Sequence, residues 1–239
     1  MINKIFTIII VIFPNIINCF NANIKSMNFN LNKDSLWLSY PLKTTGYKQI
    51  ISELPKSHKL CKCKIFEEDN LDYRLFFNIF EVNTPFFKGD RLEIVTIAEN
   101  IQDNSLSFII LDCYSNVMTW DPIDGIRGAN SKFIKKITNT KYNIQINKNK
   151  EKDSLFLLKS FKGKIQKTTL PSFSIYPNNI CYFKNFTQGY KLKFNENQLN
   201  KKVLILKNID LYHNIYTQYL KELEHAFIYP NKLDFKVLF

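Results

Sequence analysis

The chain has 239 residues, with 45% hydrophobic and 23% charged side chains, the composition of an ordinary globular protein. It has no linker-like or repeated segment, which argues against a disordered chain or a repeat array. The formal net charge of +12 comes almost entirely from scattered lysines, since arginine occurs only at Arg74, Arg91 and Arg127. Surfaces that read nucleic acid favour arginine forks, so we expect no nucleic-acid partner.

The first residues have the layout of a secretory signal. Residues 1–4 carry one positive charge, and residues 5–17 (IFTIIIVIFPNII) are largely apolar but too short for a membrane span of about 20 residues. We therefore predict a signal peptide over residues 1–22, a single β-rich domain over 23–239, and a secreted or extracytoplasmic protein. Cys19 follows a loose lipobox-like sequence, so a lipid anchor and a cysteine discarded with the signal both remain open.

The first half of the domain predicts one helix and several strands. Residues 47–54 (YKQIISEL) have helical apolar spacing and stop before a proline. Residues 73–82 (YRLFFNIFEV) are dense in strand-forming side chains. Residues 91–98 and 105–112 favour a hairpin, and so do residues 142–146 and 154–165.

The second half predicts short strands at 181–186 and 190–194 and a buried strand at 203–206 (VLIL). Asp210 is a suitable N-cap for a late helix over 211–224, and residues 226–229 and 233–238 favour a closing hairpin. The predicted fold is therefore mostly β (α+β), a bent antiparallel sheet or a closed β-barrel with one early and one late helix.

Residues 113–130 predict a long loop that contains two of the six glycines. Long loops in compact domains are often functional, so the candidate binding residues are Trp120, Asp121, Asp124 and Arg127. The aspartates lack the alternating spacing of a calcium loop, and capping of turns is the alternative role for them.

Without Cys19, four cysteines remain, an even number for an oxidising compartment. Cys61 and Cys63 are too close in sequence for an unstrained bridge, which makes Cys113 and Cys181 their candidate disulfide partners. Free buried thiols are the alternative. The spacing lacks a zinc knuckle, so neither a metal nor another cofactor is indicated.

The order of elements resembles the acetoacetate decarboxylase-like superfamily over roughly residues 45–239. The likeness comprises an early helix ending in Leu54-Pro55, the strand YRLFFNIFEV, and the strand pair through SFIILD with an irregular stretch after it. A late helix and the segment HAFIYPNKLDFKV complete it. This resemblance implies a cone-shaped β-barrel.

The resemblance also implies a catalytic lysine. In the decarboxylase, one lysine of an adjacent pair forms a Schiff base with the substrate ketone. Lys135 and Lys136 (SKFIKKI) stand in a comparable place, with Ile134 where the family has proline. Two solvated lysines on a strand edge are the alternative reading of this pair.

Three functions therefore remain open. The high aromatic content, without an evident acid–base set, favours a protein that binds a small or apolar ligand or a partner. The lysine pair favours a Schiff-base decarboxylase or lyase acting on a small keto acid. The basic charge and Cys19 favour a surface interaction protein with peripheral membrane contact.

Overall fold

The computed structural model describes residues 26–31, 35–83, 88–117, 119–121, 125–149, 154–169, 180–183, 190–194, 202–229 and 233–238. Side chains are described over residues 35–83, 88–117, 128–149, 154–169 and 202–229. The predicted signal peptide, including Cys19, and the candidate residue Asp124 lie outside these ranges.

The described chain is mostly β, as the sequence predicts. Its first strands are β1 (Ser26–Leu31), β2 (Ser35–Pro41), β3 (His58–Leu60), β4 (Lys62–Cys63), β5 (Asp72–Asn83), β6 (Lys88–Asn100), β7 (Leu106–Ser115), β8 (Thr119–Asp121) and β9 (Gly125–Arg127). The later strands are β10 (Ser131–Ile137), β11 (Lys141–Lys148), β12 (Ser154–Lys167), β13 (Ile180–Phe183), β14 (Tyr190–Phe194), β15 (Lys202–His213), β16 (His225–Tyr229) and β17 (Leu233–Leu238). The helices are α2 (Thr44–Glu53) and the 3₁₀ turn η2 (Thr217–Tyr219).

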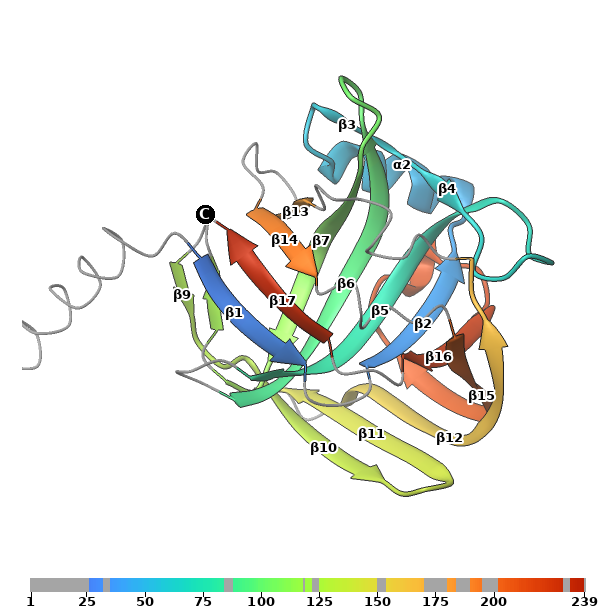
Figure 1. Cartoon of the computed structure of the whole chain (residues 1–239). Helices are drawn as coiled ribbons and strands as arrows, with labels where there is room; N and C mark the ends of the chain where they lie inside the picture. The colour runs from blue at the N-terminus through green and yellow to red at the C-terminus, as the bar shows by residue number, and fades with distance from the viewer. Residues whose placement is uncertain are drawn as a thin grey trace, which may run out of the picture.

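Fifteen of the described strands form one bent sheet, in the order β10-β11-β12-β15-β16-β2-β5-β1-β17-β14-β13-β7-β6-β3, with β4 paired to β5. The neighbours are antiparallel except for β13 and β7. The sheet as a whole is not a closed barrel, because β10 and β3 lie at its two ends. Within the sheet, β6 pairs with β5 as well as with β7 and β3. Figure 1 shows the β10–β12 end of the sheet on the opposite side of the molecule from α2. Among the described residues, no helix has the length and apolar character needed to cross a membrane.

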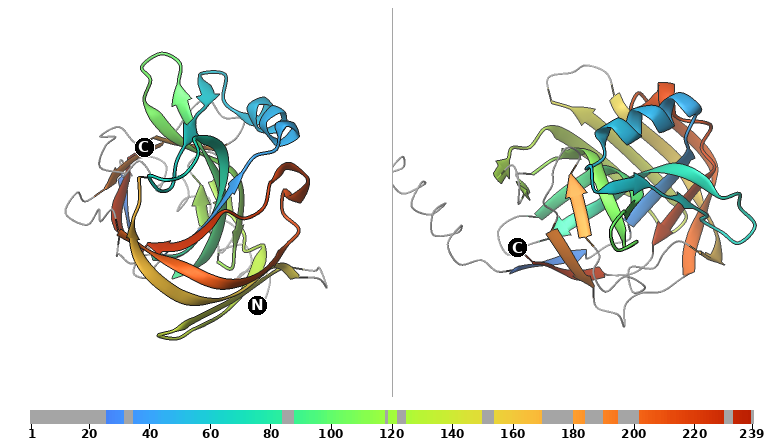
Figure 2. Two further views of the ribbon diagram at one scale, coloured as in Figure 1. Left: turned by 90° about the vertical axis from the view of Figure 1, so that its right-hand side faces the viewer. Right: turned by 90° about the horizontal axis from the view of Figure 1, so that it is seen from above.

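Strand β5 is rich in large apolar side chains because both of its faces are buried. Leu75, Phe77 and Ile79 pack in one core cluster, towards β2, β6, β11 and β12. Phe76 and Phe80 point the other way, into a second cluster. Since side chains alternate along a strand, apolar residues at successive positions require cover on both sides. The curved layers that supply this cover are visible in Figure 2.

Both hairpins of the central part are confirmed. Strand β6 pairs antiparallel with β7, with an irregularity in register between Ile94 and Val95. Strand β11 pairs antiparallel with β12. The early helix is confirmed as α2, where Ile50 is completely buried and Pro55 follows the helix end.

The predicted late helix is wrong: residues 202–213 form strand β15, followed by the short turn η2. Strand β12 has 14 residues, and β15 completes a ladder along it that ends in the pairs Leu158–Leu211 and Phe156–His213. Asp210 is not an N-cap but lies opposite Lys159 in this ladder. Tertiary pairing here overrides the helical spacing of the apolar residues.

The closing hairpin is wrong in its pairing, although both strands are present. Strand β16 lies between β15 and β2, whereas β17 lies between β1 and β14. A strand has only two edges, and β16 uses both of them, on the preceding strand β15 and on the distant strand β2. Ala226, Phe227 and Ile228 are almost fully buried as a result.

Cys61 and Cys63 are both free thiols in this structure, and their predicted pairing with Cys181 stays a prediction. Cys63 lies on β4 opposite Asp72, whereas Cys113 lies on β7 opposite Glu93. Strands β5 and β6 lie between these positions in the sheet, so the two sulfurs cannot meet. Cys181 lies on β13, and its side chain is outside the described part.

Candidate active site

Strand β10 sends the two lysines of the pair to opposite faces of the sheet. Ser131 is buried and Lys135 is half-buried on the inner face, whereas Lys132 and Lys136 are exposed on the outer face. This follows from the two-residue period of a strand. Of the two candidate catalytic residues, only Lys135 points into the protein, and Lys136 cannot act as its cationic neighbour.

The ammonium of Lys135 meets the carboxylate of Asp90, which lies near the start of β6. Their side chains are 19% and 15% exposed, so the pair is largely, but not wholly, withdrawn from water. An amine in this position has a specific proton acceptor in contact with it. The carboxylate stabilises the charged ammonium, so the amine can react only after its proton is lost, and Asp90 is the group in contact to receive that proton.

Asn116 fixes Asp90 on its other side. The amide oxygen of Asn116 accepts the backbone N–H of Asp90 at 2.7 Å, and its amide nitrogen lies 3.4 Å from Oδ2 of the Asp90 carboxylate. The backbone N–H of Asn116 also donates to the Asp90 carbonyl at 3.2 Å. Lys135, Asp90 and Asn116 are thus linked in a chain of amine, carboxylate and amide.

Hydrogen bonds also hold the backbone around these three residues in place. Asn130, just before β10, accepts the backbone N–H of Ser115 at 2.8 Å and donates its amide to the Cys113 carbonyl at 3.1 Å. These bonds fasten the start of β10 to the end of β7. Gly89 leaves room for Asn116, because a Cβ at position 89 would lie 2.5 Å from its amide oxygen. The position of Asp90 is therefore set by several strands at once.

A second carboxylate lies next to Asp90. Glu81 is its direct cross-strand neighbour on β5 and is only 6% exposed. Lys88 approaches Glu81, with Nζ 3.6 Å from Oε1. The inner end of the β5–β6 pair therefore combines two lysines with two carboxylates, a set that can accept and return protons around a reacting carbonyl.

The predicted long loop is partly a hairpin. Strand β7 extends to Ser115, and β8 and β9 pair with each other through Trp120–Ile126. Trp120 and Asp121 lie on β8 and Arg127 on β9, but the side chains of all three are outside the described part. Their predicted binding role, like that of Asp124, stays a prediction.

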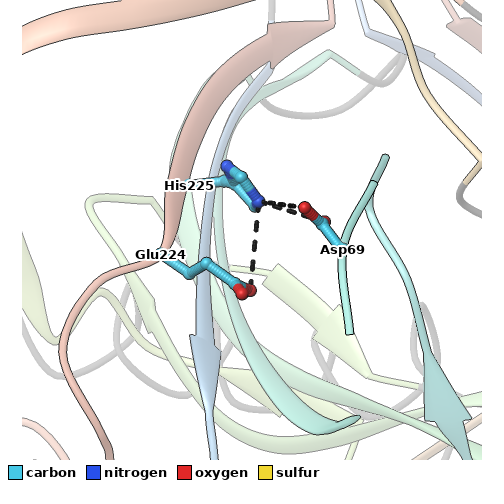
Figure 3. Close-up of side chains that lie close together, drawn as sticks. All are labelled: Asp69, Glu224 and His225. Carbon is cyan, nitrogen blue, oxygen red and sulfur yellow. Dashed lines mark hydrogen bonds and ion pairs between the residues drawn. The ribbon is translucent and has the colours of Figure 1, made fainter. Parts of the chain in front are cut away.

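A second polar cluster joins the segment after β4 to the start of β16 (Figure 3). His225 Nε2 lies 2.9 and 3.0 Å from the two oxygens of Asp69, and 3.9 Å from Oε2 of Glu224. One ligand atom from each residue lies within 4.8 Å of the others, a spacing that could suit a cation. However, the same Glu224 oxygen contacts the guanidinium of Arg74, which would repel a cation there.

This cluster is better explained as a structural latch, meaning a set of ion pairs and hydrogen bonds that joins the start of β16 to the segment after β4. Arg74 has a completely buried side chain and donates to the carbonyls of Cys63 and Asn70 at 3.0 and 3.1 Å. Burial raises the pKa of Asp69, but the Phe66 N–H, His225 and the Ile65 N–H together hold that pKa below its usual value. Each charged group thus has a protein partner, as buried charges require.

The sequence did not reveal Asp90 or Asn116. A Gly-Asp pair is typical of a turn, but Gly89 and Asp90 both belong to strand β6. Lys135 and Asp90 are 45 positions apart, and Asp90 and Asn116 are 26 apart. The only available signal was a polar residue next to a glycine at the start of a strand that is otherwise rich in apolar side chains.

No family model and no curated protein matches the chain. Solved structures do resemble it. Acetoacetate decarboxylase from Legionella pneumophila aligns with a TM-score of 0.60 at 9% identity, covering 89% of this chain and 85% of that one. The enduracididine biosynthesis enzyme MppR, complexed with pyruvate, aligns at 0.54 and 6%, covering 89% and 88%. An acetoacetate decarboxylase-like enzyme from Sphingomonas wittichii aligns at 0.52 and 7%, covering 90% and 92%. The predicted resemblance is thus confirmed as one of fold.

Proposed function

We propose that this chain, which has the fold of the acetoacetate decarboxylase-like proteins, is a lyase-type enzyme that forms a Schiff base between Lys135 and a small keto acid. The observation that carries the proposal is the inward-facing Lys135 in contact with Asp90. This single half-buried amine is held against a carboxylate that other groups position. The bound pyruvate named for MppR supports a keto acid as the substrate class.

The chemistry follows from the geometry. Asp90 takes a proton from the ammonium of Lys135, and the free amine attacks the ketone carbon of the substrate. Loss of water from the adduct gives a protonated imine. With a 3-keto acid, the bond to the carboxylate then breaks, carbon dioxide leaves, and the electron pair forms an enamine. Protonation of the enamine carbon and hydrolysis of the imine release the ketone and restore Lys135.

The surrounding groups have separate roles in this scheme. Asp90 returns its proton when the adduct loses water, because it remains within hydrogen-bond distance of the lysine nitrogen. Asn116 keeps the carboxylate turned towards Lys135 through its bonds to the side chain and backbone of Asp90. Glu81, beside Asp90, adds negative charge that favours the positive imine.

Proton NMR in D₂O with acetoacetate and pyruvate tests the proposal, since it follows both loss of substrate and exchange of the methyl protons next to the carbonyl. Lys135→Arg keeps the positive charge beside Asp90 but cannot form an imine, so its rate should fall on the order of 10³-fold or more. Lys136→Arg is the matched control and should keep the wild-type rate. Undiminished activity in Lys135→Arg, or no reaction of the wild type with either acid, contradicts the proposal.

A further inference from the structure

The outer face of β10, β11, β12 and β15 carries a surface that the proposed chemistry does not use. Cross-strand pairing places its side chains in rows, as the registers of the three ladders show. The rows run Ile134–Gln145–Leu157–Tyr212, then Lys136–Asn143–Lys159–Asp210, then Lys141–Phe161–Lys207, with Lys132 beside Asn147 at the margin. We call these rows the outer face.

The outer face is strongly basic. Its five lysines, all exposed, are Lys132, Lys136, Lys141, Lys159 and Lys207. Among the described residues of these rows, Asp210 is the one acidic side chain, and its carboxylate lies 3.9 Å from Lys159. This ion pair is weak because its two side chains are 57% and 75% exposed. The net charge of the rows is therefore five minus one, or +4.

Large apolar side chains stand among these lysines. Tyr212 is 53% exposed, Ile134 is 47% exposed and Phe161 is 39% exposed. One such side chain at a surface needs no explanation, but three within adjacent rows of one sheet face form a mixed basic and apolar surface. Lysine stems and a tyrosine ring suit a layer that is apolar on one side and wet on the other.

We propose that the outer face docks on an anionic lipid surface. The lysine ammonium groups would lie against lipid phosphates and carboxylates, while Ile134 and Tyr212 enter the headgroup layer. Two copies of this chain would not pair through the face, because like-charged rows repel each other. A nucleic acid fits less well: Lys141 lies 5.0 Å from the centre of the Phe161 ring and covers a face on which a base would stack.

Vesicle sedimentation with the full chain tests this proposal, comparing phosphatidylcholine alone with phosphatidylcholine mixed with phosphatidylserine. Residues 5–17 are uncharged but residues 1–4 carry one positive charge, so charge variants are needed to assign anionic binding to the outer face. The outer face predicts binding that requires phosphatidylserine and weakens as salt is added. Equal binding to both vesicle types, or none to either, overturns the proposal.

Charge variants locate the binding. Lys136→Gln/Lys159→Gln should weaken binding to the anionic vesicles about 30-fold, since each lysine near such a surface contributes about fivefold. Lys48→Gln/Lys56→Gln removes the same charge from exposed positions on and after α2, away from this face (Figures 1 and 2), and should change binding less than about twofold. An equal loss in both pairs overturns the assignment to this face.

A second variant separates lipid from other polyanions. Ile134→Ser/Tyr212→Ser should weaken vesicle binding about tenfold while leaving its salt dependence intact, because only the apolar contribution is lost. Retention of full affinity, or a wild-type chain that binds single-stranded RNA but not vesicles, contradicts the proposal. Circular dichroism of each variant establishes that the fold is kept. The measurement is independent of turnover, so it can fail while the proposed enzyme activity stands.

Discussion

Replacing Lys135 by methionine should destabilise the protein in a way that depends on Asp90. The substitution keeps the length of the side chain but leaves a carboxylate that is only 15% exposed without the ammonium it contacts. Exposed ion pairs contribute less than about 1 kcal/mol, whereas breaking a buried pair costs about 3 to 5 kcal/mol. With partners 19% and 15% exposed, we expect about 2 kcal/mol.

A double-mutant cycle isolates the pair from other effects. Asp90→Asn removes the charge and keeps a side chain of the same shape, and Lys135→Met/Asp90→Asn should be less destabilised than the sum of the single changes by about 2 kcal/mol. Urea unfolding followed by tryptophan fluorescence measures each value. Lys136→Met, at an exposed position, is the matched control and should change stability by less than about 0.5 kcal/mol. Additive single changes, within about 0.5 kcal/mol, would refute the contact.

Three further predictions concern the rest of the fold. Glu224→Gln weakens the charged contact to the buried Arg74, which keeps its other hydrogen bonds. The free energy of unfolding in urea should therefore fall by about 1 to 2 kcal/mol, and an unchanged value would argue against the latch. Burial lowers the pKa of His213, so its contribution to stability should be complete above the ordinary histidine pKa of about 6.5 and should decline as pH falls below that value. Calorimetry across pH would detect this decline, and His213→Phe should reduce it. Burial raises the pKa of Cys63 to about 12, so maleimide at pH 8 followed by peptide mapping should label this thiol only after denaturation.

The elements that depend on local pattern could be predicted from the sequence. The hairpins β6–β7 and β11–β12 join consecutive strands, so alternation and a polar turn are enough to identify them. The apolar run of β5 indicated a strand but not the two core clusters that cover it. Pairings between distant segments, such as β16 with β2, leave no local signal in the chain.

The late helix shows why local pattern was insufficient. Apolar residues at 211, 215, 219 and 223 fit a helix, yet β12 offers a long edge that β15 completes in extended form. The left-handed backbone of Tyr216, with φ of 55°, then turns the chain before a helix can begin. Ile215 is buried all the same, so the apolar spacing reports burial rather than helical conformation.

The candidate site was predictable only in its lysine pair. The lysine pair stands out in the sequence, and the alternation of β10 decides which lysine points inward. Asp90 and Asn116 come from β6 and from the residue after β7, and the β6–β7 ladder brings them together, whereas Lys135 reaches them from β10, which pairs with neither strand. Identifying a base and its orienting group therefore required the three-dimensional fold.

Reductive trapping tests the central claim most directly. The chain is incubated with pyruvate or acetoacetate, treated with borohydride, and analysed by intact mass and peptide mapping, with Lys135→Arg and Lys136→Arg alongside. A Schiff base at Lys135 predicts a single reduced adduct on the peptide that contains this residue, present in Lys136→Arg and absent in Lys135→Arg. No adduct, or an adduct that persists in Lys135→Arg, would contradict the assignment of this lysine as the nucleophile.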